Sequence, residues 1–371
     1  MAIGFPVKAN YASGDVLTAA NMNDLSGTVN TLSGATSKNY LINGGFAVAQ
    51  RGTSFTSTGS ANNDDAYTLD RWYILSDGND IIDVTQETTT VPTNGKFAIA
   101  LDVETVNKKF GIATIIENKD VIGLVGNTVN FSFKAKVSAT TKLDNVKAAI
   151  VAWSGTADTV TSDIISAWGA EGTNPTLIAN ATYENTPANL SLTTSYATYS
   201  VSAAVDTAST QNLILFIWSD VTDTTLGDFL YIAESKLGLG STATAFEYAG
   251  GTFQGELAAC QRYYVRFGGE SAYQAINTSG FGTSTTRIDY VFQFPVKMRT
   301  APSAIDYSTV STFLANAGSS SVTPTSFAID QATTYGSKID SRYASGVVAD
   351  RCYYLMANNS ATSYVGFTAE L

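Results

Sequence analysis

Residues 39–72 read NYLINGGFAVAQRGTSFTSTGSANNDDAYTLDRW, and this stretch decides how the chain is interpreted. Its distinctive pieces are Leu41-Ile42-Asn43-Gly44-Gly45-Phe46, Gln50-Arg51-Gly52-Thr53-Ser54-Phe55, and Tyr67 with Asp70-Arg71-Trp72. Glycine permits backbone angles that other residues avoid, and an arginine can pair with a carboxylate while its stem covers an aromatic face. The stretch therefore predicts a structural clasp that fastens the first strand, in preference to a ligand contact.

The same pieces resemble the opening of the jelly-roll, carbohydrate-binding-like module of phage tail-fibre and receptor-binding proteins. Residues 231–240 and 243–248 resemble the last strand and exit of that module, and residues 255–264 resemble the short connecting helix that follows it. The resemblance covers residues 39–264. It departs from the family at Ala49, where an aromatic residue is common, so the packing under the first turn is expected to differ.

Length and composition indicate a β-rich protein of more than one domain. The chain has 371 residues, which exceeds the size at which a single core usually stops growing. Hydrophobic residues make up 44% and charged residues 14%, with many Ser, Thr, Tyr and Phe residues. The net charge is 21 − 32 = −11 and the basic residues do not cluster, which argues against nucleic acid as a partner.

Targeting and cysteine signals are sparse. No run of about eighteen apolar residues occurs, so no membrane insertion is predicted. The N-terminus has no basic segment ahead of an apolar one, which fits a protein made in a cytoplasm and delivered by assembly or lysis. The tail-fibre resemblance implies that this is a bacterial host cytoplasm and that the protein ends in the virion. Cys260 and Cys352 do not make a disulfide framework, and both are predicted to be small buried apolar residues.

Residues 1–38 differ from the rest of the chain. Thr18 is a candidate N-cap, and an a/d seam recurs at Met22, Leu25, Val29 and Leu32. The seam predicts self-association or docking on another virion protein, with a tail packed on its own domain as the alternative. The wording GDVLTAANMN resembles the N-terminal docking segment of phage tail proteins, and the tail-fibre resemblance implies a homotrimer.

Short β-rich runs alternate with turn residues from residue 39 to about residue 250. Nine strands are predicted, at residues 71–75, 81–85, 97–103, 111–117, 128–137, 148–153, 197–201, 212–218 and 229–236. Their number and spacing predict a sandwich or jelly roll. Residues 213–218 are continuously apolar, so this strand is expected to be central and buried on both faces.

The predicted loop at residues 154–196 is long enough to suggest a function or structure of its own. Residues 161–168 are expected to form a short turn of helix. The aromatic residues that gather around the loop are Trp153, Trp168, Tyr183, Tyr196 and Tyr199. They favour packing of the loop onto the sandwich, with sugar binding as the alternative.

A second β-rich region follows residue 264, with strands predicted at residues 287–294, 325–331, 351–357 and 363–371. Residues 294–302 resemble the corresponding strand and turn in tail-fibre C-terminal domains. Loops carry recognition, so the receptor contact is predicted on residues 267–281 and 310–335. The expected rings are Tyr273, Phe281, Phe313 and Tyr335, with Arg287 and Lys338 as polar partners. The open alternative is that these rings fill a trimer core.

The residue inventory excludes several kinds of catalysis. The chain has no histidine, which excludes histidine triads and imidazole acid–base chemistry. The acidic groups in turns are Asp64, Asp65 and Asp70, then Asp77 and Asp80, then Asp220, Asp223 and Asp228. Such residues are turn formers more often than catalysts or calcium ligands. We therefore expect no enzyme activity, no cofactor and no metal, with a structural calcium ion as the alternative.

These observations predict an all-β chain: a docking and oligomerisation segment at residues 1–38, a jelly-roll module at residues 39–253 and a smaller β-rich receptor-binding domain at residues 254–371. The resemblance implies a homotrimeric phage tail fibre protein in the virion, attached to other tail or baseplate proteins and binding a host surface polysaccharide or receptor. A structural tail or capsid decoration protein is the alternative. A polysaccharide-degrading tailspike is disfavoured because the sequence lacks the repeat of a β-helix.

Overall fold

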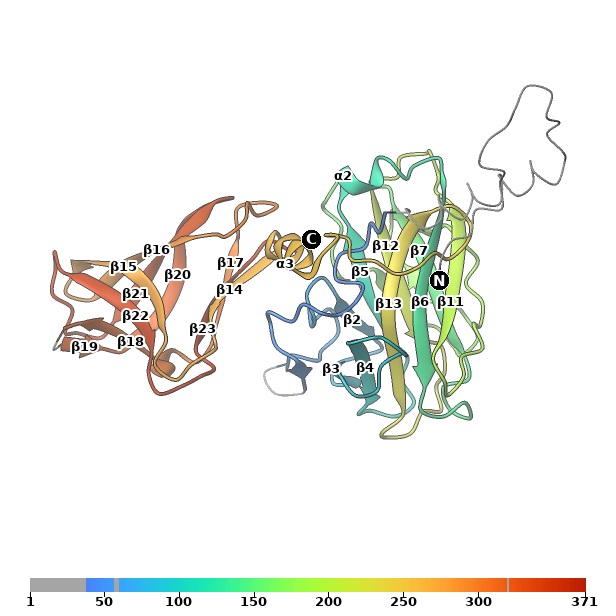
Figure 1. The fold of residues 1–371 in the computed structure, drawn as a ribbon, viewed down its shortest axis with the longest axis horizontal. Helices are drawn as coiled ribbons and strands as arrows, with labels where there is room; N and C mark the ends of the chain where they lie inside the picture. The colour runs from blue at the N-terminus through green and yellow to red at the C-terminus, as the bar shows by residue number, and fades with distance from the viewer. Residues whose placement is uncertain (1–37, 57–59, 319) are drawn as a thin grey trace, which may run out of the picture.

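The fold is a jelly-roll β-sandwich followed by a second set of antiparallel sheets (Figure 1). The computed structural model describes residues 38–56, 60–318 and 320–371. The six-stranded sheet of the sandwich runs in the order β1 (Ser54–Phe55), β3 (Ile82–Glu87), β4 (Ala98–Val103), β13 (Phe229–Leu239), β6 (Thr128–Val137) and β11 (Ala197–Ala204). The five-stranded sheet runs in the order β10 (Ala181–Tyr183), β7 (Val146–Trp153), β12 (Asn212–Ser219), β5 (Phe110–Ile116) and β2 (Tyr73–Ser76).

Period-two alternation builds the core between these two sheets. Phe131 and Phe133 of β6 face Leu215 and Ile217 of β12 across the sandwich, and all four are buried in one cluster. The polar residues that alternate with them on β6, such as Lys134, lie on the outer face of the six-stranded sheet. This alternation leaves that face open for a functional site.

The outer face of the five-stranded sheet is covered by the long connection at residues 154–196, which we call the covering connection. Ile214, Phe216 and Trp218 of β12 pack in a second cluster with Ile164 and Trp168 of this connection. Two short strands within it, β8 (Ile165–Ala167) and β9 (Thr176–Leu177), pair with each other. Every residue of β12 is buried, so the prediction of a central strand at residues 213–218 is confirmed.

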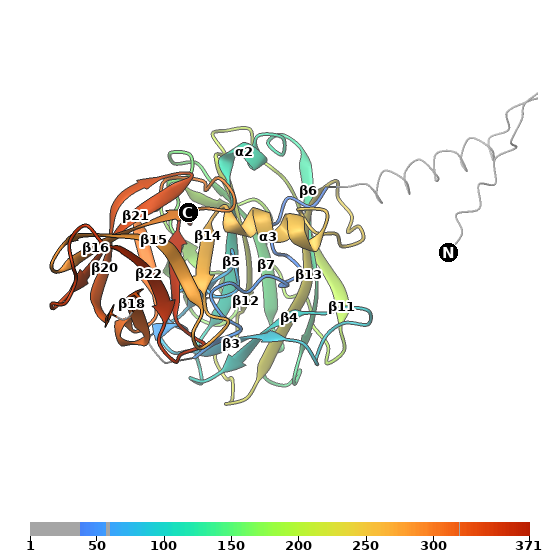
Figure 2. The ribbon, with the colours of Figure 1, turned by 60° about the vertical axis from the view of Figure 1, so that its left-hand side comes forward.

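Two helices mark the edges of the sandwich, α2 (Asn118–Val121) and α3 (Phe253–Gln261). The Thr252 hydroxyl caps α3 by accepting a hydrogen bond from Gly255 N at 3.1 Å. α3 leads into a three-stranded sheet in the order β14 (Tyr264–Gly268), β23 (Tyr364–Thr368) and β17 (Ala304–Tyr307). Figures 1 and 2 show α3 at the junction between the sandwich and the second set of sheets.

A seven-stranded sheet completes the second part, with the short helix η2 (Val310–Thr312) beside it. Its order is β19 (Ser320–Val322), β18 (Phe313–Ala317), β22 (Cys352–Ala357), β15 (Ala275–Ser284), β16 (Arg287–Gln293), β21 (Gly336–Tyr343) and β20 (Pro324–Thr333). Tyr290, Phe292 and Phe367 belong to a core cluster that is separate from the two sandwich clusters.

The predicted clasp is present, and it also ties the end of the chain to the sandwich. The buried Arg71 guanidinium pairs with the Glu370 carboxylate and lies 3.7 Å from the centroid of the Tyr263 ring. The Asp70 carboxylate accepts hydrogen bonds from the backbone and side-chain nitrogens of Gln50, both at 2.6 Å. The interactions expected of a clasp are therefore present, with Glu370 as the carboxylate that pairs with Arg71.

Three sequence-based predictions need correction. Residues 161–168 form no helix, because Ile165–Ala167 are extended as β8 and Trp168 reaches the Phe216 ring instead. Cys352 is exposed on the outer face of β22, whereas Cys260 is buried as predicted. The final strand ends at Thr368 instead of the last residue.

The seam residues Met22, Leu25, Val29 and Leu32 lie outside the described residues. Within the described part of the chain, neither helix has the length and apolar character that a membrane crossing needs.

Candidate functional site

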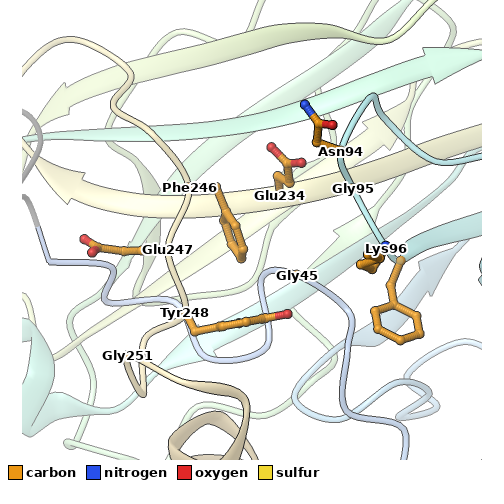
Figure 3. Close-up of a pocket in the computed structure, with 10 residues that line it drawn as sticks. Gly45, Asn94, Gly95, Lys96, Glu234, Phe246, Glu247, Tyr248 and Gly251 are labelled. Carbon is orange, nitrogen blue, oxygen red and sulfur yellow. The ribbon is translucent and has the colours of Figure 1, made fainter. Parts of the chain in front are cut away.

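A groove crosses the outer face of the six-stranded sheet. Its floor is formed by β13 and β6, and its walls are the β3–β4 loop at residues 88–97 and the segment at residues 241–251. Two adjoining hollows, of about 280 and 400 Å³, share Asn94, Glu234 and Phe246. Figure 3 shows these three residues around the first hollow. The groove is large enough for a sugar unit.

Glu234 is directed into the groove by an irregularity in β13. The pairing of β13 with β6 shifts register between Ala233 and Lys236, and Glu234 has a φ of 48° in the left-handed region. A β-bulge of this kind redirects a side chain and often lies beside a binding site. The Glu234 carboxylate pairs with Lys134 Nζ at 2.7 Å, and both side chains remain partly exposed.

The bulge is held by the glycine pair of the opening stretch. Ser235 N donates to Gly44 O at 2.8 Å, and a Cβ on Gly44 would lie 1.9 Å from Ser235 O. Only glycine permits this approach. Gly44 therefore acts at the groove indirectly, because it fixes the strand irregularity that aims Glu234, whereas Gly45 is part of the lining.

An aromatic pair forms one wall of the groove. Phe246 and Tyr248 meet edge to face with ring centroids 5.6 Å apart, and Gly45 packs against both rings. Burial raises the pKa of Tyr248, with a further contribution from Glu256. Lys236 Nζ donates to Ala245 O at 2.9 Å and so fixes the segment that carries the rings. Phe246 remains half-buried, which leaves ring surface for a ligand.

Tyr196 secures the opposite wall. Its hydroxyl donates to Thr90 O at 2.9 Å, which ties the β3–β4 loop to the residue that precedes β11. Lys136 Nζ lies 5.9 Å from the Tyr196 ring centroid and 5.3 Å from that of Tyr231. Burial raises the pKa of Tyr196, so the phenol stays protonated and remains a donor at neutral pH.

Most aromatic residues around the long connection have structural roles. The Trp168 ring meets Phe216 edge-on at 6.0 Å, and the Tyr183 hydroxyl donates to Pro175 O at 2.8 Å. Trp153 is buried in the same cluster, and Tyr199 packs against the sandwich core. The packing interpretation is therefore confirmed for these four residues.

Of the four rings predicted as receptor contacts on the second part, one is buried and three are exposed. Phe313 is fully buried and its ring meets Phe327 at 5.1 Å, so its assignment as a sugar-stacking residue is wrong. Tyr273, Phe281 and Tyr335 are exposed, and they lie in the β14–β15 connection, on β15 and in the β20–β21 turn respectively. The Tyr335 ring has Lys297 Nζ 5.3 Å from its centroid.

Arg287 and Lys338 are committed to ion pairs on the sheet surface. Arg287 pairs with Asp289 at 2.5 Å, and Asp330 pairs with Arg287 at 2.8 Å and with Lys338 at 2.7 Å. Asp340 completes this group at 3.4 Å from Arg287. The two basic side chains therefore hold neighbouring strands together.

Among the acidic residues named from sequence, Asp220 has a defined role. It is fully buried between Lys109 and Lys147, and it lies 2.6 Å from Lys147 Nζ. Lys109 Nζ also donates to Ala170 O and Thr173 O at 2.7 and 3.1 Å. The triad thus pins the covering connection to the sandwich and is closed to a polymeric substrate.

The other acidic groups form no metal centre within the described ranges, where no cluster of three or more Cys, Asp or Glu residues has the geometry to hold an ion. Sequence reasoning missed Glu234, Phe246 and Asn94. The family-like ending at residues 243–248 contained Phe246 but gave no sign that this segment crosses the sheet.

No protein-family model matches the chain, and no curated protein matches it in sequence. Similar solved structures include the enzymatically active domain of bacteriophage CBA120 tailspike protein 4, with 15% identity over 54% of this chain and a TM-score of 0.32. The match spans 21% of that tailspike chain.

Two carbohydrate-binding modules are also similar in structure. One, described as "CBM4 structure and function", has 12% identity over 53% of this chain and 98% of its own, with a TM-score of 0.29. The other, TmCBM61 in complex with β-1,4-galactotriose, has 14% identity over 55% of this chain and 100% of its own, with a TM-score of 0.28.

Proposed function

We propose that this protein is a non-enzymatic attachment protein of a phage virion that binds a host surface glycan through the groove on its six-stranded sheet. One observation carries the glycan assignment: a half-buried Phe246 ring lies in the same hollow as the Glu234–Lys134 pair. The virion assignment rests on the resemblance of residues 39–264 to tail-fibre modules.

The arrangement matches the chemistry of a sugar. A pyranose ring has an apolar face that stacks on an aromatic ring, and its hydroxyls donate and accept hydrogen bonds around the edge. The Glu234 carboxylate accepts from hydroxyls, Lys134 donates to them, and the Asn94 amide does both. The bulge and the Gly44 contact hold the carboxylate in place before the ligand arrives, which reduces the entropic cost of binding.

The test is binding of the purified chain to host cells and to isolated host polysaccharide. Phe246→Ala removes the stacking surface and is expected to weaken binding by about tenfold, since such a ring contact contributes about 1.4 kcal/mol. Ile122→Ala is the matched control, because it removes an exposed apolar side chain outside the groove. Equal binding by the two variants would contradict the proposed site.

The same assay separates the alternatives. A decoration protein would bind virions and show no affinity for cells. A polysaccharide-degrading enzyme would release sugar, and the relevant substitution is Glu234→Gln, because Asp220 is buried. Tyr273→Ala and Tyr335→Ala test the remaining predicted contacts, since both rings are exposed.

A further inference from the structure

Strands β15 and β16 separate over half their length. They pair only from Phe281 opposite Asp289 to Ser284 opposite Arg287. On its other side, β15 shifts register against β22 twice, between Ala275 and Gly280. A third register shift lies between Gly282 and Ser284 in the pairing with β16, and no residue of β15 before Phe281 pairs with β16. We call the resulting gap in the sheet the β15–β16 opening.

Side chains replace the missing ladder hydrogen bonds. Asn277 Nδ2 and Ser279 Oγ both donate to Val291 O, at 2.7 and 3.1 Å. The Asn277 side-chain oxygen accepts from Ser279 N at 2.8 Å. This bridge holds the strands apart at a fixed distance, so the opening is part of the fold. It forms a depression of about 470 Å³, whose lining includes Thr278 and Gln293.

Exposed apolar side chains surround the depression. Val291 is 49% exposed and Phe281 is 44% exposed. Phe281 lies opposite Cys352, and Tyr354 follows two residues later on β22, so alternation places the Phe281 and Tyr354 rings on the same outer face. Phe281 follows Ser279 of the lining by two residues on β15, so its ring is the aromatic surface next along the strand from the depression.

The lining specifies an uncharged ligand. It contains amide, hydroxyl and aliphatic groups and no charged side chain. The nearby Arg287 is occupied by Asp289 and Asp330. Amides and hydroxyls beside a ring face suit the hydroxyls and apolar face of a neutral sugar.

We propose that the β15–β16 opening is a second saccharide site, specific for a neutral sugar. The sugar stacks on Phe281, exchanges hydrogen bonds with the Gln293 amide and donates to the hydroxyl oxygen of Ser279. This inference rests on the proposed attachment function, and it gives the molecule one site on each part. Two sites on one chain raise the avidity for a repeating polysaccharide without any new contact.

The test is a titration of the full chain with maltotriose, cellotriose and triacetylchitotriose, followed through the methyl NMR signals of Val291. At least one of these neutral probes is expected to shift the signals. Phe281→Ala and Gln293→Ala should each weaken that interaction by about fivefold or more. Phe253→Ala is the matched control, because its ring on α3 has a similar exposure of 48% and lies outside the opening. No movement of the Val291 signals with any probe overturns the proposal.

Cell binding by the same variants separates this inference from the proposed function. If Phe246→Ala loses binding while Phe281→Ala and Gln293→Ala retain it, the second site is refuted and the groove stands. If all three retain binding, both are refuted. A lower oligomer mass for Phe281→Ala, measured by light scattering, would identify the rings as a contact between copies and would also refute the site.

Discussion

Burial distinguishes the charged residues that stabilise the fold from the charged residues that are exposed to solvent and ligands. Lys109 and Asp220 are both essentially inaccessible, and Lys109 satisfies backbone carbonyls of the covering connection as well as the carboxylate. Exposed ion pairs contribute little by comparison, because water solvates both partners. Lys108, the neighbour of Lys109 in sequence, forms an exposed ion pair with Asp77. The buried pair and the exposed pair can therefore be compared directly.

Lys109→Met is expected to lower the free energy of unfolding by about 3 kcal/mol, because it leaves Asp220 underpaired and several carbonyls without a donor. Chemical denaturation measures the change. Lys108→Met is the control: Lys108 is 41% exposed and pairs with an exposed Asp77, so a loss below about 1 kcal/mol is expected. Equal losses at the two positions would show that the buried triad has no special role.

Asp65 gives the protein a pH-dependent stability. Burial, with repulsion from Asp64 and Asp163, raises its pKa to about 7, whereas the unfolded value is about 3.9. The folded state therefore holds a proton that the unfolded state releases, so stability falls as the pH rises from about 4 to about 7. The change is complete once the pH exceeds the folded pKa.

Asp65→Asn removes the loss of stability at higher pH, because the amide has no ionisable proton. The variant should gain stability relative to the parent between pH 5 and pH 8, a range that brackets the folded pKa of about 7, as seen in melting temperatures. Asparagine tolerates the φ of 66° at this position. Asp350→Asn makes the same change at an exposed residue with a φ of 61°, and a matching pH trend there would exclude Asp65 as the source.

At the scale of elements, the alternation of apolar and polar residues predicted the strands well, but it did not predict which aromatic side chains are exposed. The β6 strand was predicted at its observed bounds because Phe131, Phe133 and Ala135 alternate with polar residues. On β18, Phe313 and Leu314 are adjacent and both apolar, so alternation cannot choose the buried one; the core takes Phe313. The short turn of helix predicted at residues 161–168 likewise failed, because contacts of Ile164 and Trp168 with the sheet decide the conformation there.

The groove was beyond sequence reasoning for a related reason. Glu234 reaches it through a bulge, and that bulge depends on Gly44, about 190 residues earlier in the chain. Phe246 reaches it because a segment after the last sandwich strand crosses back over the sheet. Both are long-range arrangements, which residue periodicity does not encode.

The Tyr196 phenol ties the groove wall at residues 88–97 to the segment that precedes β11. Tyr196→Phe removes the hydrogen bond to Thr90 O and is expected to cost about 1 kcal/mol of local stability. Amide hydrogen exchange across residues 88–97 should quicken, because local opening governs exchange. Residues 241–251 on the facing wall are the internal control; faster exchange on both walls would mean that the whole sandwich had weakened.

At the scale of the whole molecule, Glu370 joins the two parts. It pairs with Arg71 and lies 3.3 Å from Arg51, and both arginines belong to the opening stretch of the sandwich. Glu370→Gln is expected to destabilise the junction by on the order of 3 kcal/mol, since it leaves two buried guanidinium groups without their carboxylate. Limited proteolysis should then cut earlier around α3.

Glu270→Gln is the control for that experiment, because it neutralises an exposed carboxylate on the second part. Calorimetry supplies a second readout: loss of the junction should split the melting of the two core regions into separate transitions. A single unchanged transition in Glu370→Gln would show that other contacts suffice.

The junction also determines how the molecule carries mechanical load. The second part leaves the sandwich through α3 and returns to it at Glu370, so both ends of its chain are fastened at one place (Figure 1). A pull on the seven-stranded sheet would be shared between the covalent chain through α3 and the ion pairs of Glu370. Only the ion pairs can yield, and their loss would leave the second part held by α3 alone and free to turn about it.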